Sequence, residues 1–162
     1  MYRRACFAVL LAVLSFLATQ SAQAAGPFQY HSLTPCRLID TRDGSGASNE
    51  VAGPRSNPGP HTFRVQGFCG IPAGADAVSL NVTIVTPSTG GDLRLFPSNV
   101  GQPLVSMLNY NAGEPALANG AILPVAQVAG DDIAMAIGMA CGSNGCGSVH
   151  VLMDVTGYFD SP

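Results

Sequence analysis

Apolar and polar residues alternate along much of the chain, most regularly over residues 77–85 and 148–159. A period of two is what a β-strand needs to bury one face and expose the other. Both segments therefore predict strands that lie against a hydrophobic core. In the first segment, the residues expected on the buried face are Val78, Leu80, Val82 and Ile84, with Ser79, Asn81 and Thr83 on the other.

Several shorter segments show the same alternation, and clusters of Gly, Pro, Asn and Asp separate them. They cover residues 28–42, 61–67, 92–97, 105–110, 117–125 and 132–139. About eight short strands at regular spacing, with no helical period after the N-terminal segment, predict an all-β domain. We expect a single antiparallel β-sandwich of jelly-roll type. We also expect residues 133–139 and 149–155 to form a hairpin.

The N-terminus has the parts of a secretory signal peptide. Two arginines precede an apolar run over residues 5–18, and a small-x-small cleavage motif ends at Ala24. The apolar run is shorter than the roughly 20 residues that span a bilayer, which weakens the alternative of a membrane anchor. We expect a signal peptide at 1–24, a secreted or cell-surface domain at 25–162, and no membrane span after cleavage.

Charge and motifs narrow the classes of function. The chain contains no lysine, and its formal net charge is −3. No basic cluster is present to neutralise phosphates, so a nucleic-acid partner is not expected. The sequence also lacks a Walker loop, a dinucleotide glycine fingerprint, a Gly-x-Ser-x-Gly elbow and a His-Glu-x-x-His motif. We therefore expect no cofactor and no catalytic residue.

Four cysteines follow the predicted leader. An even number in an exported chain indicates two disulfides. Among the three pairings we favour Cys36 with Cys69 and Cys141 with Cys146, because the short segment between the last two can close a hairpin tip. A four-thiolate zinc site is the competing interpretation, but the usual Cys-x-x-Cys pairs are absent.

Isolated polar residues lie inside otherwise apolar strands. These candidate site residues are Asp40, Arg42, Asn81, Arg94, Asn109, Asn119 and Asp154. One interpretation is a polar network in which Arg42 or Arg94 neutralises Asp40 or Asp154, and we favour it because buried charges need partners. The other is a sugar-binding surface, for which the candidate stacking aromatics are Phe96, Tyr110, Tyr158 and Phe159.

Two weaker arrangements also use these carboxylates. His150 and Asp154 fall on the same strand face, which would suit a hydrolase. Asp40, Asp43 and Glu50 offer oxygen ligands to calcium but do not follow the EF-hand pattern. We predict neither a metal site nor an active site.

Six motifs in order resemble an uncharacterised family of secreted bacterial domains. They lie at residues 34–42, 69–75, 78–83, 91–97, 109–113 and 154–159. The family has a P-x-R-L-L-D-T-R opening and a D-V-x-G-Y-F ending, and its domains occur alone or appended to exported proteins, including cell-wall hydrolases. The resemblance covers most of residues 25–162 and implies no catalytic residue.

Together these features lead us to expect an exported, non-catalytic binding module that recognises an extracellular carbohydrate or cell-wall polymer. The alternative is a structural or protein-interaction module of the envelope, whose partner would be an envelope protein.

Overall fold

The structure, a computed structural model, describes residues 26–48, 52–56, 59–142 and 145–162. The predicted signal peptide lies outside these residues. The described residues form strands, turns and irregular segments, with no helix and hence none able to cross a membrane. The strands are β1 (Gln29–Asp40), β2 (His61–Phe63), β3 (Ala77–Val85), β4 (Gly91–Pro97), β5 (Leu108–Tyr110), β6 (Leu117–Pro124), β7 (Ile133–Met139), β8 (Cys141–Gly142), β9 (Gly145–Cys146) and β10 (His150–Asp160).

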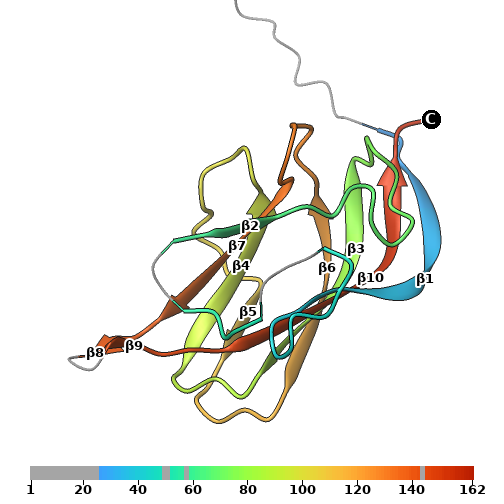
Figure 1. The fold of residues 1–162 in the computed structure, drawn as a ribbon. Helices are drawn as coiled ribbons and strands as arrows, with labels where there is room; N and C mark the ends of the chain where they lie inside the picture. The colour runs from blue at the N-terminus through green and yellow to red at the C-terminus, as the bar shows by residue number, and fades with distance from the viewer. Residues whose placement is uncertain (1–25, 49–51, 57–58, 143–144) are drawn as a thin grey trace, which may run out of the picture.

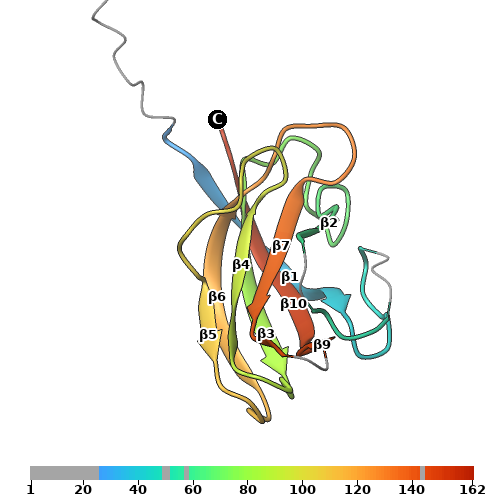
Figure 2. The ribbon, with the colours of Figure 1, turned by 90° about the vertical axis from the view of Figure 1, so that its left-hand side faces the viewer.

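Eight of these strands form two four-stranded antiparallel sheets, with the orders β1-β10-β3-β6 and β2-β7-β4-β5. The sheets lie face to face as two layers (Figures 1 and 2). From β1 to β10 the chain crosses between the sheets at every step except β4 to β5 and the small β8-β9 hairpin. This is the topology of a jelly roll, so the predicted fold class is confirmed.

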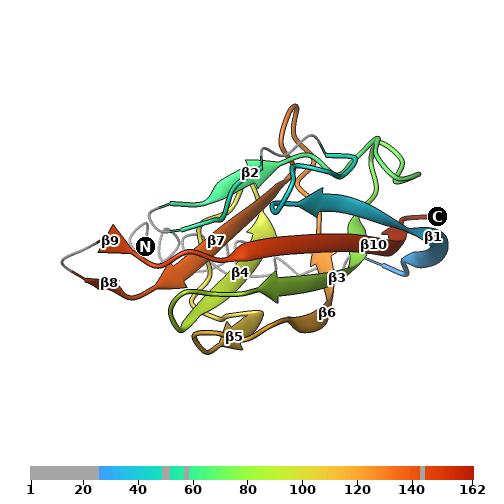
Figure 3. The ribbon, with the colours of Figure 1, turned by 60° about the horizontal axis from the view of Figure 1, so that its bottom comes forward.

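The expected hairpin between residues 133–139 and 149–155 is wrong. β7 lies between β2 and β4 in one sheet, whereas β10 lies between β1 and β3 in the other. Both are central strands, and the crossing allows each to have two neighbours while its apolar face lies against the core. The cysteine loop carries the crossing, and its β8-β9 hairpin projects from one end of the sandwich (Figure 3).

The core lies between the sheets and follows the alternation in the sequence. In β3 and β10 the inward side chains are almost completely buried, while the residues between them have partly exposed side chains, apart from the buried Leu152. The face of the β1-β10-β3-β6 sheet that points away from the core is called the outer face below. The inward residues of these two strands are Val78, Leu80, Val82, Ile84, Val151, Met153 and Val155.

Both expected disulfides are present. Cys36 in β1 is bonded to Cys69 in the turn after β2, with the Cα atoms 5.7 Å apart. Cys141 and Cys146 are bonded across the β8-β9 hairpin. The first bond joins β1 to the loop between β2 and β3, and the second closes the crossing loop.

Candidate functional site

A β-bulge in β1 determines which side chains reach the outer face. Arg37 pairs with Asp154 of β10, but the next paired residue is Ile39, so Leu38 is an extra residue in the ladder. Leu38 and Ile39 are both fully buried. After the bulge, Asp40 lies on the same face as Arg37, three residues earlier. A strict period of two would place these two side chains on opposite faces, and the bulge is the reason that they share one face.

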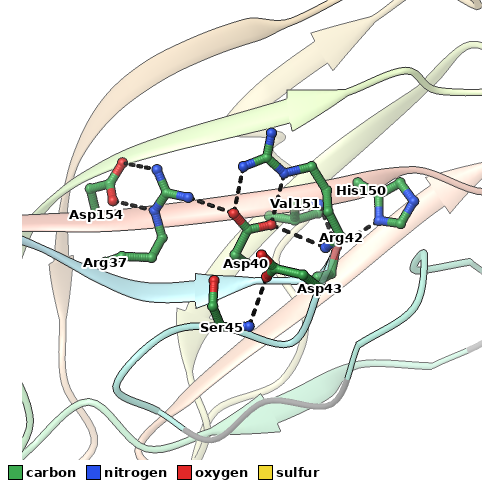
Figure 4. Close-up of polar contacts among 9 residues, drawn as sticks. Arg37, Asp40, Arg42, Asp43, Ser45, His150, Val151 and Asp154 are labelled. Atoms are coloured by element: carbon green, nitrogen blue, oxygen red, sulfur yellow. Dashed lines mark hydrogen bonds and ion pairs between the residues drawn. The ribbon is translucent and has the colours of Figure 1, made fainter.

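The bulge assembles a network of two arginines and two aspartates, drawn in Figure 4. Arg37 donates to both carboxylate oxygens of Asp154, through Nε and through Nη2 at 3.3 Å. Its Nη1 donates to Asp40 Oδ2 at 2.7 Å. Arg42 donates to Asp40 from Nε at 2.9 Å and from Nη2 at 2.6 Å. Asp40 therefore accepts hydrogen bonds from both guanidinium groups, and the four charges sum to zero.

Asp40 is the centre of this network. Its side chain is 3% exposed, whereas those of Arg37 and Arg42 are 35% and 50% exposed. The hydrogen bonds from the Arg42 guanidinium lower the pKa of Asp40 to about 2, against the opposing effect of burial. The hydrogen bond to Asp154 raises the pKa of the Arg37 guanidinium. Asp40 is thus a buried carboxylate that remains ionised because it is paired.

His150 is held by Thr41 and not by Asp154. The Thr41 hydroxyl lies 3.2 Å from His150 Nδ1 and accepts a hydrogen bond from the Val151 amide at 2.9 Å. Asp154 is bonded to Arg37 instead. The acid–base pair suggested for a hydrolase is therefore not formed.

The remaining candidates do not converge on this network. Arg94 pairs with Asp92 on the other sheet, with Nε 2.9 Å from Oδ2, so it neutralises neither Asp40 nor Asp154. The side chain of Asn109, in β5 of that other sheet, accepts a hydrogen bond from the Ser106 hydroxyl at 3.0 Å. Asn119 donates to the Met107 carbonyl oxygen at 2.8 Å. The candidates on the outer face are Asp40, Arg42, Asn81 and Asp154.

Three side chains of β3 form a polar row along the outer face: Ser79, Asn81 and Thr83. Ser79 Oγ lies 3.0 Å from Thr156 Oγ1 of β10. Within the part of the chain that the structure describes, the Asn81 and Thr83 side chains make no hydrogen bond, although Asn81 lies opposite Asp154. Their polar groups are therefore available to a ligand at the surface.

An exposed aromatic ring lies beyond one end of the polar row. Tyr30 is 51% exposed, and its hydroxyl donates to the Thr156 carbonyl oxygen at 3.3 Å. The ring lies across Gly157, where an added Cβ would come within 2.4 Å of it. It also contacts the Phe159 ring at a centroid distance of 5.0 Å. The outer face thus combines an aromatic surface with a line of hydrogen-bonding groups.

No group of three or more His, Cys, Asp or Glu side chains is placed to bind a metal among the described residues. Of the carboxylates considered for calcium, Asp40 is bonded to arginines and Asp43 accepts a hydrogen bond from the Ser45 amide at 2.8 Å. Glu50 lies outside the described residues.

Sequence reasoning missed the role of Arg37, which links both aspartates of the network. The signal that could have revealed it is the adjacent apolar pair Leu38-Ile39, which breaks the alternation of β1. Two consecutive buried residues on one strand are what a bulge permits.

The fold and the outer face define a jelly-roll domain with an open polar surface. The chain matches no family model and no curated protein. Its fold is similar to that of Tobacco streak virus coat protein. In the structure of the coat protein dimer, the TM-score is 0.35 and the identity 10%, over 88% of this chain and 92% of that one. A second crystal form has the same score and identity, over 84% and 90%.

Proposed function

We propose that this chain is an exported, non-catalytic binding module that recognises an extracellular carbohydrate or cell-wall polymer. The observation that carries the proposal is the polar row of Ser79, Asn81 and Thr83 beside the exposed Tyr30 ring. Both lie on the outer face of the β1-β10-β3-β6 sheet.

The chemistry of this face suits a sugar chain. An amide and a hydroxyl each donate and accept hydrogen bonds, as sugar hydroxyls do. An aromatic ring offers a rigid apolar surface to the C–H face of a sugar ring. Alternate residues of a strand are about 7 Å apart, so the polar row spans about 14 Å. That length favours an extended polymer over a small enclosed ligand.

The electrostatics favour binding over catalysis. A general acid needs a pKa near the working pH, which enzymes reach by leaving a carboxyl group desolvated or close to another carboxylate. Here Asp40 is bonded to two guanidinium groups, which keep its pKa at about 2. Asp154 is paired with Arg37. These charges support the sheet and leave recognition to the neutral polar row.

The test is a pulldown of the chain by insoluble polysaccharides and purified cell walls, followed by titration of any ligand found. Asn81→Ala and Tyr30→Ala should each weaken binding by about fivefold to tenfold, as expected for loss of one hydrogen-bonding or stacking group. Asn109→Ala is the matched control, because it makes the same change on the other sheet. Failure to bind any polysaccharide or peptidoglycan, or equal losses with the control, would count against the proposal.

The second candidate is a structural or protein-interaction module of the envelope. The observation in its favour is the loop between β4 and β5, where Leu104 is 96% exposed and Val105 is 76% exposed. Exposed apolar side chains in a row are typical of protein contacts. Crosslinking in intact cells should then recover an envelope protein, and Leu104→Ser with Val105→Ser should abolish the crosslink while leaving polysaccharide binding unchanged.

A further inference from the structure

Three of the four sheet edges offer only short or interrupted stretches for pairing. At the end of β1 the chain's own loop covers the edge: Ser45, Ala47 and Ser48 make backbone hydrogen bonds to Asp40, Arg37 and Leu38, respectively, at 2.8–3.0 Å. The earlier part of β1 is interrupted by an irregular register between Ser32 and Cys36. β2 and β5 have three residues each, too short to offer much of a ladder. Short edges and covering loops are common ways to prevent unwanted strand pairing.

β6 is the exception. It has eight residues and forms the edge of the β1-β10-β3-β6 sheet beyond β3. Among the described residues, no backbone hydrogen bond reaches its side away from β3. Five of its residues are exposed, and Ile122 has the largest side chain among them, with an exposed fraction of 66%. A long open edge of this kind is a template for another strand.

The ladder with β3 shows which backbone groups are free. The Val125 amide donates to the Asp76 carbonyl oxygen at 2.9 Å. In an antiparallel pair, alternate residues direct both backbone groups toward the partner strand. The residues between them therefore direct their N–H and C=O groups away from β3. These residues are Ala118, Gly120 and Ile122, and their side chains lie on the outer face, opposite Thr83, Asn81 and Ser79.

We propose that β6 pairs antiparallel with β6 of a second copy of this chain, about a twofold axis at Gly120. Gly120 then faces Gly120 of the second copy, and Ala118 faces the second copy's Ile122. Each facing pair has its free N–H and C=O groups directed at the other strand, so each exchanges two hydrogen bonds. The two sheets become one continuous sheet of eight strands.

Charge favours a second copy as the partner. The chain has a formal net charge of −3, so two copies repel one another over most of their surfaces. Residues 115–130, which include all of β6, contain no charged side chain. Two copies therefore meet at this edge without placing like charges opposite each other.

The side chains of this edge are self-complementary in size. A twofold contact places each residue against its counterpart from the other end of the strand. The large Ile122 therefore packs against the small Ala118 and Gly120 of the second copy. Pro124 has no N–H group and so ends the ladder on that side.

This inference does not depend on the proposed polymer binding. If both hold, the polar rows of the two copies share one continuous outer face, and the second copy increases the avidity for a long polymer. Failure of dimerisation would leave monomeric binding intact, and failure of polymer binding would leave the dimer intact.

The test is sedimentation velocity of the full chain, with both disulfides formed, over a range of concentrations. Gly120→Lys places two like charges at the axis. The chain should tolerate the change, because an added Cβ at Gly120 meets nothing nearer than the Leu80 carbonyl oxygen at 3.9 Å. Val128→Lys is the matched control, since it adds the same charge at an exposed apolar position outside β6.

We expect the native chain and the Val128→Lys control to form dimers, and Gly120→Lys to weaken self-association by about fivefold. At concentrations low enough for both chains to be monomeric, the thermal midpoint of Gly120→Lys should equal that of the native chain. Amide hydrogen exchange of Ala118, Gly120 and Ile122 should slow as the native chain is concentrated, and should not slow in the variant. A chain that stays monomeric at all concentrations, or a dimer that Gly120→Lys leaves unaffected, overturns the proposal. Protection of these amides only upon addition of a different protein also overturns it.

Discussion

Replacement of Asp40 by asparagine tests the ion-pair network most directly. The side chain keeps its size but loses its charge, and an NH2 group replaces one of the two acceptor oxygens. Each oxygen of Asp40 accepts a guanidinium hydrogen bond from Arg42, and Oδ2 accepts one from Arg37 as well. The substitution therefore removes one or two hydrogen bonds between charged groups, each worth about 1.5–3 kcal/mol.

Two effects moderate this loss. Arg37 and Arg42 are partly exposed, so their released donors bind water. The remaining amide oxygen still accepts from at least one arginine. We expect Asp40→Asn to lower the free energy of unfolding by about 2–4 kcal/mol at pH 7, somewhat less than the roughly 3–5 kcal/mol for breaking a fully buried pair.

The lowered pKa of Asp40 also predicts how the stability difference between the two proteins changes with pH. The pKa of Asp40 is lowered from 3.8 to about 2 in the folded chain. A lowered carboxyl pKa stabilises the folded state above the unfolded value of 3.8, and that contribution is lost as the pH falls through about 2. The variant has no carboxyl group at this position. The difference in unfolding free energy between the two proteins should therefore be constant at neutral pH and shrink between about pH 4 and pH 2.

Urea unfolding of both proteins at pH 7 and at a series of acidic values measures this difference. Asp131→Asn is the control, because Asp131 is an exposed residue whose carboxylate accepts a hydrogen bond from the Thr62 hydroxyl at 2.7 Å. It should change the unfolding free energy by no more than about 0.5–1 kcal/mol. The reasoning is refuted if Asp40→Asn costs no more than the control, or if its cost is the same at pH 7 and pH 2.

Three further predictions concern other parts of the fold. Replacing Cys36 and Cys69 together by serine should lower the unfolding free energy by about 2–4 kcal/mol in urea, and an unchanged midpoint would contradict a structural role. Gly91→Ala should destabilise by about 1–3 kcal/mol, because its Cβ would lie 2.3 Å from a backbone carbonyl oxygen, whereas Gly101→Ala, with no atom within 4 Å, should change thermal unfolding little. Burial raises the pKa of Tyr110 to about 12, so its phenolate absorbance should appear only above pH 10, in a late step that Tyr110→Phe removes, and stability should fall over the same pH range.

The sequence predicted the strands well because alternation is a direct consequence of burying one face of a sheet. Residues 77–85 match β3 at both ends, and the cysteine pairs are those favoured by spacing. β1 was harder. Its bulge at Leu38 reverses the faces of the following residues, and a strict period of two cannot contain such a reversal.

Partnerships between distant strands were the least predictable feature. Alternation identifies the buried face of a strand, but does not say in which sheet the strand lies. Residues 133–139 and 149–155 are adjacent in sequence, which favoured a hairpin, yet they lie in opposite sheets. For the same reason the sequence did not reveal the partner of Arg94, which is Asp92 on its own strand. Phe96 and Tyr110, considered as sugar-stacking residues, are each only 5% exposed.

The position of the last strand has a consequence for how the molecule acquires its structure. β10 lies in the middle of its sheet and is the shared neighbour of β1 and β3. A nascent polypeptide that lacks β10 therefore has a gap in the sheet, with β1 on one side of the gap and β3 on the other. Folding of this sheet requires β10, which is distant in sequence from β1 and β3, so folding should be slow, as for other proteins whose contacts are distant in sequence.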